Sequence, residues 1–245
     1  MAELAEQVAL VTGSSGGVGA AVARMLSALG VHVVINSRTS AAAGEALAAA
    51  LRSCYVQADV SDPVAARALV EGVAATHGRL DIVVNNAATT DVIAHDDLDS
   101  ATPEVWQRIL ATNVVAPFVV TGAARPWLEV APAGGVVVNI GSVAGVRPGG
   151  SSIPYAVSKA GLHHQTKLLA IALAPRIRVN AVAPGMVETD WVASSPAARE
   201  TIAELAPLRR NAEPDDVAEV VLAQIRSGQV TGEVWVVDGG FQLVR

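Results

Sequence analysis

Short runs of β-branched and other apolar residues recur along the chain, and an Ala- and Leu-rich amphipathic stretch follows nearly every one of them. The runs cover residues 8–11, 31–35, 54–58, 82–84, 136–140, 178–182 and 234–237. Because these runs are continuously apolar instead of alternating with polar residues, both faces of each strand are expected to be buried between layers of helices. The pattern therefore predicts an α/β fold with a doubly wound, seven-stranded parallel sheet and helices on both faces.

The chain shows no internal boundary. No Pro- and Ser-rich linker or change of composition divides its 245 residues, so a single domain over 1–245 is predicted. Two stretches rich in Gly, Ser, Pro and polar residues, 143–153 and 186–210, are predicted to be loops at strand ends. Ligands of such sheets bind at the carboxyl ends of the strands, so these loops are expected to border a binding site.

Charge and composition narrow the kind of partner. The net charge is -6, and the 17 Lys and Arg residues are scattered without a basic block, which argues against nucleic acid and anionic membrane surfaces. No uninterrupted apolar run approaches the roughly 18 residues that a membrane span needs, and the first residues lack the basic segment of a secretion signal. We therefore expect a cytoplasmic protein that acts on a small molecule.

Disulfides and metal sites are not expected. Cys54 is the only cysteine, which excludes an intramolecular disulfide and a cysteine metal cluster, and its thiol is expected to be buried. His163 and His164 are adjacent, so on a helix their side chains point about 100° apart and do not converge on one ion.

A glycine-rich turn follows the first predicted strand directly and opens an Ala-rich helix. Its sequence runs from Thr12 through Gly13, Ser14, Ser15, Gly16, Gly17 and Val18 to Gly19. Glycines in this place allow the backbone to approach a pyrophosphate, whose charge the helix N-terminus stabilises. The spacing T-G-x-x-x-G-x-G resembles the signature of the short-chain dehydrogenase/reductase family. A purely structural tight turn is the alternative interpretation.

The end of the second strand bears on the choice of cofactor. NAD-binding sites usually carry Asp or Glu about 20 residues beyond the glycines, but no acidic residue stands between Glu6 and Glu45. Ser37 and Arg38 occupy this place instead, and a guanidinium suits bidentate contact with a 2′-phosphate. NADPH is therefore predicted in preference to NADH. The alternative is that Arg38 is a solvated surface residue, since the glycine turn carries no second basic residue.

Four residues carry the predicted chemistry. Tyr155 and Lys159 are four positions apart, which places both side chains on one face of a helix. Ser142 follows the fifth predicted strand thirteen residues before Tyr155, and Asn113 lies in the segment Ala-Thr-Asn-Val. Together with the glycine turn, these motifs resemble the short-chain dehydrogenase/reductase family over essentially the whole chain. The resemblance implies a Rossmann fold with a cofactor-binding half at about 1–110 and a catalytic half at about 111–245.

The chemistry explains these residue types. A free phenol with a pKa near 10 is a poor acid at neutral pH, and we expect the Lys159 ammonium to lower the pKa of Tyr155. In ketone reduction Tyr155 would protonate the carbonyl oxygen while Ser142 holds that oxygen by a hydrogen bond. By resemblance, Lys159 also contacts the nicotinamide ribose, and Asn113 holds a water of a proton relay. An asparagine that merely kinks its helix remains an alternative.

The resemblance implies further contacts. Asp59 and Val60 would meet the adenine, and Met186 and Trp191 would contact the substrate from a lid at about 186–208. The remaining implied cofactor residues are Asn86, Ala87, Pro184, Gly185, Val187 and Thr189, besides Gly13, Ser15, Gly17, Val18, Gly19, Tyr155 and Lys159. Asn85 and Asn86 could instead bridge neighbouring strands, and Trp191 could be ordinary packing.

Three functions stay open. The first is NADPH-dependent reduction of a ketone to a secondary alcohol, including a 3-oxoacyl thioester, since the chain is similar to 3-oxoacyl-[acyl-carrier-protein] reductases. Lys159 and Lys167 are the only lysines, so a carrier-protein partner is not favoured, although Arg125, Arg147 and Arg176 could substitute. The second is oxidation of a polyol, steroid or other secondary alcohol, and the third is a non-catalytic nucleotide-binding scaffold. A homotetramer or homodimer is implied by resemblance.

Overall fold

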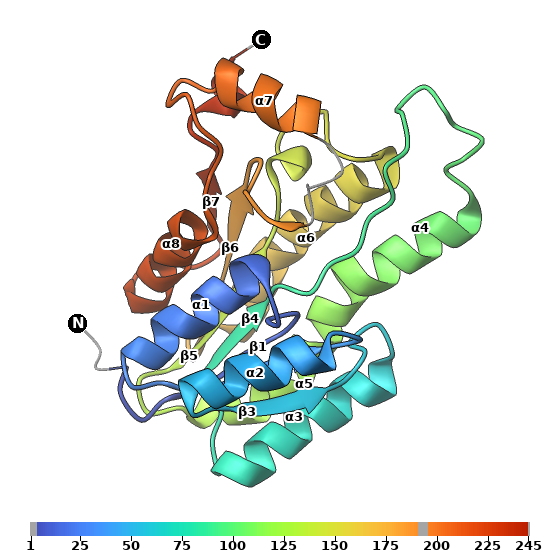
Figure 1. Cartoon of the computed structure of the whole chain (residues 1–245). Coiled ribbons are helices and arrows are strands. Elements are labelled where there is room, and N and C mark those ends of the chain that lie inside the picture. Colours follow the sequence, from blue (N-terminus) through green and yellow to red (C-terminus); the bar gives the residue numbers. More distant parts are fainter. Residues whose placement is uncertain (1–3, 191–195, 245) are drawn as a thin grey trace.

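The computed structural model describes residues 4–190 and 196–244 and confirms the predicted fold class (Figure 1). Seven parallel strands form one sheet in the order β3-β2-β1-β4-β5-β6-β7. They are β1 Val8–Val11, β2 His32–Ser37, β3 Cys54–Gln57, β4 Ile82–Asn85, β5 Gly135–Ile140, β6 Ile177–Pro184 and β7 Val234–Val237. The strand order reverses between β1 and β4, which is where doubly wound sheets open a crevice for a ligand.

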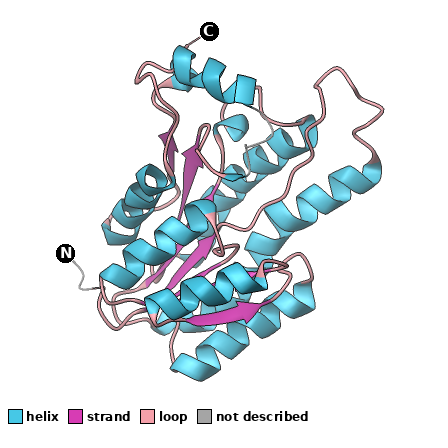
Figure 2. Cartoon of the chain, viewed as in Figure 1, coloured by secondary structure: helices cyan, strands magenta, loops and turns pink. Residues whose placement is uncertain are grey.

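Helices cover both faces of the sheet. Helices α1, α2 and α8 pack on one face, and α3, α5 and α6 pack on the other, as the two layers of core residues show (Figure 2). The helices are α1 Gly17–Ala28, α2 Ala41–Leu51, α3 Pro63–His77, α4 Pro103–Leu110, α5 Ala116–Val130, α6 Ile153–Leu173, α7 Pro196–Leu205 and α8 Pro214–Arg226.

The two core layers explain why the central strands are apolar at every position. In β1, Ala9 and Val11 belong to the layer under α1, whereas Val8 and Leu10 belong to the layer under α3. Successive side chains of a strand point to opposite faces, so a strand that is buried on both faces has no polar position. All four residues of β1 are buried.

The edge strands depart from this pattern. Strand β3 borders the sheet, and its four residues are exposed or only partly buried. Cys54, the first residue of β3, is exposed, so the expectation of a buried thiol is wrong. An edge strand lacks a neighbour on one side and is covered by fewer helices, and an apolar sequence run does not reveal its place in the sheet.

Local sequence signals set the limits of the helices. Asp62 caps α3 by accepting the backbone N–H of Val64 at 2.8 Å, and α3 ends at Gly78, whose φ of 69° is left-handed. Ser152 likewise caps α6, because its Oγ accepts the backbone N–H of Tyr155 at 3.3 Å. The cap therefore fixes the start of the helix that presents Tyr155.

The two predicted loops contain short helices. A 3-10 turn, η2, spans Val143–Gly145, and α6 begins at Ile153. Helix α7 spans Pro196–Leu205 within the stretch predicted as a loop, and Figure 1 shows it beyond the carboxyl ends of β6 and β7. Trp191, the predicted lid contact, lies outside the described residues.

One continuous helical stretch is long and apolar enough to cross a membrane by length and composition alone. It spans Pro103–Val130 and contains α4, the π-helical turn η1 Ala111–Val115, and α5. Half of the apolar 18-residue segment within it is buried inside the protein. The stretch packs against α3 and α6. We therefore attribute its apolar character to the core of this fold.

Candidate active site

The glycine turn is fixed to the end of β4 by two side chains. The Asn86 amide donates to the carbonyl oxygens of Thr12 and Gly13 at 2.9 and 2.8 Å, and the Thr12 Oγ1 accepts the N–H groups of Asn86 and Ala87 at 3.1 Å each. Gly13 has a φ of 62°, and a Cβ on it would lie 2.8 Å from the Ala87 Cα. Only glycine adopts this positive φ without strain and leaves room for the Ala87 backbone.

Ser14 is a supporting residue that the sequence analysis did not assign. It is fully buried, its Oγ donates to the Val11 carbonyl at 2.7 Å, and the same Oγ accepts the N–H of Asn36 at 3.1 Å. Asn36 in turn accepts the N–H of Gly13 through its Oδ1 at 3.3 Å. The end of β2 and the glycine turn are therefore one hydrogen-bonded unit. The only sign of this role of Ser14 in the sequence is that a small polar residue stands between the glycines.

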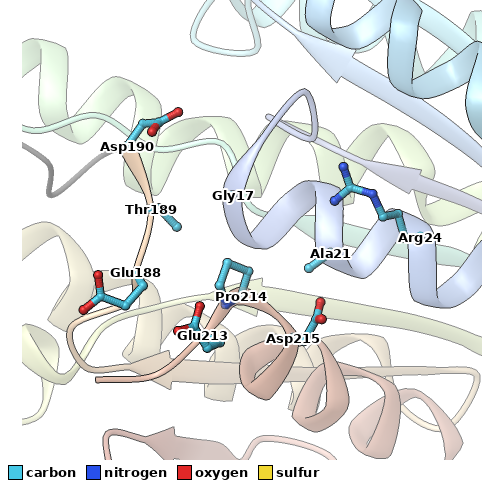
Figure 3. Close-up of a pocket in the computed structure, with 9 residues that line it drawn as sticks. All are labelled: Gly17, Ala21, Arg24, Glu188, Thr189, Asp190, Glu213, Pro214 and Asp215. Carbon is cyan, nitrogen blue, oxygen red and sulfur yellow. The ribbon is translucent and has the colours of Figure 1, made fainter. Parts of the chain in front are cut away.

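The N-terminus of α1 is open to an anion. Helix α1 follows Gly16 with no side-chain cap and no acidic residue in its first turn. Its first N–H groups and the helix dipole therefore favour a negative charge. Thr189 lies over this end, since a Cβ on Gly17 would sit 3.4 Å from the Thr189 methyl group. The predicted phosphate residues Gly17 and Thr189 are thus neighbours, as Figure 3 shows.

A shallow pocket opens on the outer side of this turn. It is lined by Gly17, Ala21, Arg24, Glu188, Thr189, Asp190, Glu213, Pro214 and Asp215 (Figure 3). Four of these side chains are acidic and one is basic, so the outer part of the pocket would repel a phosphate. Glu188 is held by an ion pair with Arg199 and a 2.7 Å bond from the Asn211 amide. We therefore place the predicted phosphate contact at the N–H groups of α1 and not among these carboxylates.

The residues that are predicted to bind the adenosine part of the cofactor lie at the ends of β2 and β3. The Arg38 guanidinium is 56% exposed and lies 3.9 Å from the Asp59 carboxylate. The Asp59 Oδ1 also accepts the backbone N–H and hydroxyl of Ser61 at 2.9 and 2.6 Å. The Ser37 hydroxyl pairs with the Tyr55 hydroxyl at 2.9 Å. Val60, by contrast, is buried in the core layer of α3.

Ser142 and Tyr155 meet at the carboxyl end of β5. Ser142 follows Ile140 by two residues and caps η2 by accepting the Ala144 N–H at 3.1 Å. Tyr155 is the third residue of α6, and its phenol lies close enough to the Ser142 side chain for that hydroxyl to lower the pKa of Tyr155. The structure thus brings together two groups that the sequence separates by thirteen positions.

Lys159 lies one turn beyond Tyr155 on the same face of α6. Its Nζ donates to the Ile140 carbonyl at 2.8 Å and lies 5.7 Å from the centroid of the Tyr155 ring. The side chain is 2% exposed, and this burial lowers the pKa of Lys159 to about 8. The ammonium therefore still carries its charge at neutral pH.

The expected net lowering of the Tyr155 pKa is wrong for this structure. Burial raises the pKa of Tyr155, and the hydrogen bond with Ser142, which acts in the opposite direction, does not compensate. Removal of water disfavours the phenolate more than nearby polar groups favour it. Tyr155 is consequently neutral at physiological pH, which is the form that can donate a proton.

Asn113 lies in the π-helical turn between α4 and α5 and is buried. Its Oδ1 accepts the Thr89 N–H at 2.8 Å, and its Nδ2 donates to the Thr89 carbonyl at 2.9 Å and to the Ser158 hydroxyl at 3.0 Å. The Ser158 hydroxyl itself donates to the Tyr155 carbonyl at 2.7 Å. Asn113 therefore links the loop after β4 to the helix of Tyr155, a structural role that the sequence did not predict, and its part in a proton relay stays a prediction.

Asn85 has an architectural role. Its Nδ2 donates to the Asn139 Oδ1 at 2.9 Å and to the Thr121 Oγ1 at 3.3 Å, and the Asn139 amide donates to the Thr166 Oγ1 at 2.9 Å. This ladder joins β4 and β5 to α5 and α6. The Asn86 side chain is likewise occupied with the glycine turn, and its contact with a cofactor stays a prediction.

The segment after β6 contains the other predicted cofactor and substrate residues. Pro184 ends β6, and the Gly185 N–H donates to the Val237 carbonyl at 2.9 Å. The Met186 carbonyl accepts the N–H of Ala212 at 3.0 Å, and Val187 forms a bridge with Ala212.

Ser15, Val18 and Met186 are partly buried, and Gly19 is buried in the first turns of α1. Within residues 4–190 and 196–244, His, Cys, Asp and Glu form no group of three that could hold a metal ion.

Comparison with known proteins identifies relatives of this chain. A family model described as "Enoyl-(Acyl carrier protein) reductase" matches residues 13–242. The "Granaticin polyketide synthase putative ketoacyl reductase 2" of Streptomyces violaceoruber is 51% identical over 97% of this chain and 96% of its own length. The cis-4-hydroxycyclohexanecarboxylate dehydrogenase of Sinomonas cyclohexanicum is 37% identical over 98% of each.

Solved structures agree with these relatives. A short-chain type dehydrogenase/reductase from Mycobacterium ulcerans superposes with a TM-score of 0.90 at 30% identity, covering 98% of this chain and 91% of that one. The aldohexose dehydrogenase of Thermoplasma acidophilum superposes with a TM-score of 0.89 at 26% identity, covering 99% and 96%. The likeness thus extends over nearly the whole chain.

Proposed function

Because the chain belongs to the short-chain dehydrogenase/reductase family, whose members are NAD(P)-dependent oxidoreductases, we propose that it reduces a ketone to a secondary alcohol with NADPH. The observation that carries this proposal is the approach of Ser142 to a neutral, partly buried Tyr155, with the Lys159 ammonium one turn away. Such a pair offers a hydrogen-bond donor and a proton donor to one oxygen atom. A phenol that stays protonated can act as the acid in the reductive direction.

The residues present fit a dinucleotide. The glycine turn approaches its neighbours so closely that side chains at Gly13 and Gly19 would collide, with a Cβ on Gly19 lying 2.5 Å from the Asn86 Nδ2. The uncapped start of α1 would hold the pyrophosphate, and Lys159 would hold the nicotinamide ribose. When bound, the reduced nicotinamide supplies the hydride.

The chain's own groups handle the oxygen and its proton. Ser142 donates a hydrogen bond to the carbonyl oxygen, so it stabilises the negative charge that develops there as hydride reaches the carbon. Tyr155 then transfers its hydroxyl proton to that oxygen, which completes the alcohol and leaves a phenolate. The Lys159 ammonium stabilises this phenolate until solvent returns the proton.

Arg38 supports NADPH as the preferred cofactor. Its half-exposed guanidinium stands at the end of β2, and its neighbour Asp59 is 3.9 Å away, within reach of a salt bridge but without close contact. Arg38→Ser should raise the KM for NADPH by about tenfold to a hundredfold, since a charge-assisted contact is worth about 1.5–3 kcal/mol, and should leave the KM for NADH unchanged. Equal effects on both cofactors would remove Arg38 from the site. Arg67→Ser, at an exposed position of α3, is the control.

We infer a polyketide-type or other 3-oxoacyl ketone as the substrate class, because the Streptomyces relative is named as a ketoacyl reductase. Docking of a carrier protein is less well supported. Arg125 pairs with Glu129 at 2.6 Å, Arg147 donates to the Phe241 and Val244 carbonyls at 2.9 Å each, and Arg176 donates to the Glu129 carbonyl at 2.8 Å. The three arginines that could replace the missing lysines are thus engaged within the chain.

Alcohol oxidation is the second candidate. The named activities of the Sinomonas and Thermoplasma relatives favour it, since both are dehydrogenases. The same proton transfer in reverse would serve it, with the Tyr155 phenolate as the base and the Lys159 ammonium beside it. A non-catalytic scaffold has no such support, since Asn113, Ser142, Tyr155 and Lys159 are all present.

We further propose a homotetramer or homodimer in the cytoplasm. Large apolar side chains are exposed along the outside of α5 and α6, and removing them from water on assembly would stabilise a dimer. They include Phe118, Val157, Leu168 and Ile171, of which Ile171 is 80% exposed. Leu168→Glu with Ile171→Glu should yield a monomer in light scattering, whereas an unchanged mass would exclude this face.

The experiment that tests the activity is NADPH oxidation against a panel of acetoacetyl thioesters, aryl ketones, cyclic diketones and steroid ketones. Tyr155→Phe should lose about two to four orders of magnitude in turnover, as expected for a proton donor, while still binding NADPH. Turnover of thioesters would support the ketoacyl substrate class, and turnover of free ketones alone would support general carbonyl reduction. Near-normal turnover by Tyr155→Phe would exclude the mechanism.

A further inference from the structure

His163 lies directly behind Ser142. Tyr155, Lys159 and His163 are spaced four residues apart, so they form one stripe along α6 that faces the end of β5. The imidazole is buried, with 7% of the residue exposed, and its Nε2 lies 3.4 Å from the backbone nitrogen of Ser142, which donates to it. The ring also lies against the backbone of Gly145, since a Cβ on Gly145 would be 2.9 Å from the His163 Cε1.

These contacts select one tautomer of the ring. The Ser142 N–H is a donor, so the Nε2 must carry a lone pair and the proton must reside on Nδ1. The Gly145 backbone raises the pKa of His163, as a carbonyl oxygen close to a ring N–H does. The imidazole therefore joins the first residue of the turn Ser142–Gly145 to its last.

The backbone near Ser142 leaves room for the His163 ring. A Cβ on Gly141 would lie 2.1 Å from the His163 Nε2, and a Cβ on Gly145 would lie 2.9 Å from its Cε1. Either methyl group would force the ring or the turn to move. Gly141 thus allows the imidazole to lie against the main chain, whereas a Cβ on Gly145 would first meet the backbone of α6, 2.6 Å from the Lys159 carbonyl carbon.

The charges around His163 keep it neutral. Burial has the largest effect, and the ammonium groups of Lys159 and Lys167, one turn before and one turn after on α6, act in the same direction, so the pKa of His163 falls to about 4. A protonated ring would present an N–H to the Ser142 N–H and add a positive charge beside Lys159. The neutral ring avoids both conflicts.

We propose that His163 is a positioning residue for Ser142: by accepting the Ser142 N–H and packing against the Gly145 backbone, it fixes the turn that carries the Ser142 hydroxyl toward Tyr155. The inference rests on the proposed role of Ser142 in ketone reduction. His163 itself does not touch the reacting atoms. Its contribution is therefore to the rate of the chemical step and not to cofactor binding.

The test compares His163→Leu, which removes the acceptor, with His163→Gln, which keeps an acceptor near the position of Nε2. His163→Leu should lower kcat by about tenfold to a hundredfold, the cost of a small misplacement of a reacting group, with the KM for NADPH unchanged. His163→Gln should recover most of this loss. His164→Leu, at the exposed neighbouring position, is the matched control and should retain full turnover.

A double-mutant cycle separates positioning from general disruption. If His163 acts through Ser142, His163→Leu should have little further effect on kcat in a Ser142→Ala background. A loss of equal size in both backgrounds would overturn the proposal, and so would equal losses for the Leu and Gln variants or wild-type kcat in His163→Leu.

An independent readout covers the case in which no ketone is turned over. In wild-type protein, ¹⁵N NMR of the imidazoles should show one ring, absent from His163→Gln and still present in His164→Gln, that is protonated only at Nδ1 at pH 7 and stays neutral down to about pH 5. A protonated ring or the Nε2–H tautomer at pH 7 would overturn the inference. Absence of ketone turnover with the expected tautomer would count against the proposed function alone.

Discussion

Replacement of Lys159 by Met should stabilise the folded protein near neutral pH while abolishing turnover. Burial lowers the pKa of Lys159 from its ordinary value of 10.5 to about 8. Between these two values the unfolded chain holds a proton that the folded protein has lost, so stability rises with pH across this window. Below about pH 8 both states are charged and the folded state bears the whole cost of a buried ammonium.

The size of the effect follows from the same values. Each pH unit within the window corresponds to about 1.4 kcal/mol, so the cost at pH 7 is about 3 kcal/mol. Methionine removes this cost, but it also removes the 2.8 Å charge-assisted hydrogen bond from Lys159 to the Ile140 carbonyl, which is worth about 1.5–3 kcal/mol. We therefore expect Lys159→Met to raise the free energy of unfolding at pH 7 by at most about 2 kcal/mol.

Urea unfolding at a series of pH values between 7 and 10.5 measures this difference. The gain of Lys159→Met over wild type should shrink as the pH rises through 8 and should vanish or reverse near 10.5. Lys167, the only other lysine, is exposed on the same helix, and Lys167→Met should change stability little at any pH. A less stable Lys159→Met at pH 7, or a gain that does not depend on pH, would refute the reasoning.

Three further predictions concern buried groups. Asp81 is 1% exposed and accepts both the Val8 N–H at 2.9 Å and two bonds from Arg79, so Asp81→Asn should cost about 2 kcal/mol in urea unfolding; an unchanged midpoint would contradict this. Asn139→Ala should cost about 2 kcal/mol in thermal unfolding, because it removes two buried hydrogen bonds of the ladder. The kcat/KM for ketone reduction should be constant below pH 8 and fall above it, since Tyr155 stays protonated while Lys159 loses its charge near pH 8; a profile that rises with pH would argue for oxidation.

The sheet and the helix face shared by Tyr155 and Lys159 could be predicted from the sequence, because each produces a short, regular pattern of residues along the chain. Continuous apolar runs predict doubly buried strands, and the spacing of Tyr155 and Lys159 predicts one helix face. Chain order along such runs does not say which strand borders the sheet, and for that reason the burial of Cys54 was predicted wrongly. The place of a strand in the sheet depends on contacts between distant segments.

The supporting residues were inaccessible for a related reason. Ser14 and His163 act on backbone groups of other segments, at Asn36 and Ser142 respectively. Every residue carries a backbone N–H, so the partner leaves no mark in the sequence. Glycines at positions 141 and 145, on either side of Ser142, are a weak indication that a side chain packs against this backbone. Glycine at these positions is equally consistent with an ordinary turn.

The balance of charge at the active site depends on burial more than on any single pair. Burial disfavours the charged form of all three groups on the α6 stripe: it raises the pKa of Tyr155 and lowers the pKa values of Lys159 and His163 to about 8 and about 4. At pH 7 only Lys159 is therefore charged. A second positive charge at position 163 would lower the pKa of Lys159 further and release its proton. The neutrality of His163 thus preserves the one ammonium that can stabilise the Tyr155 phenolate after proton transfer.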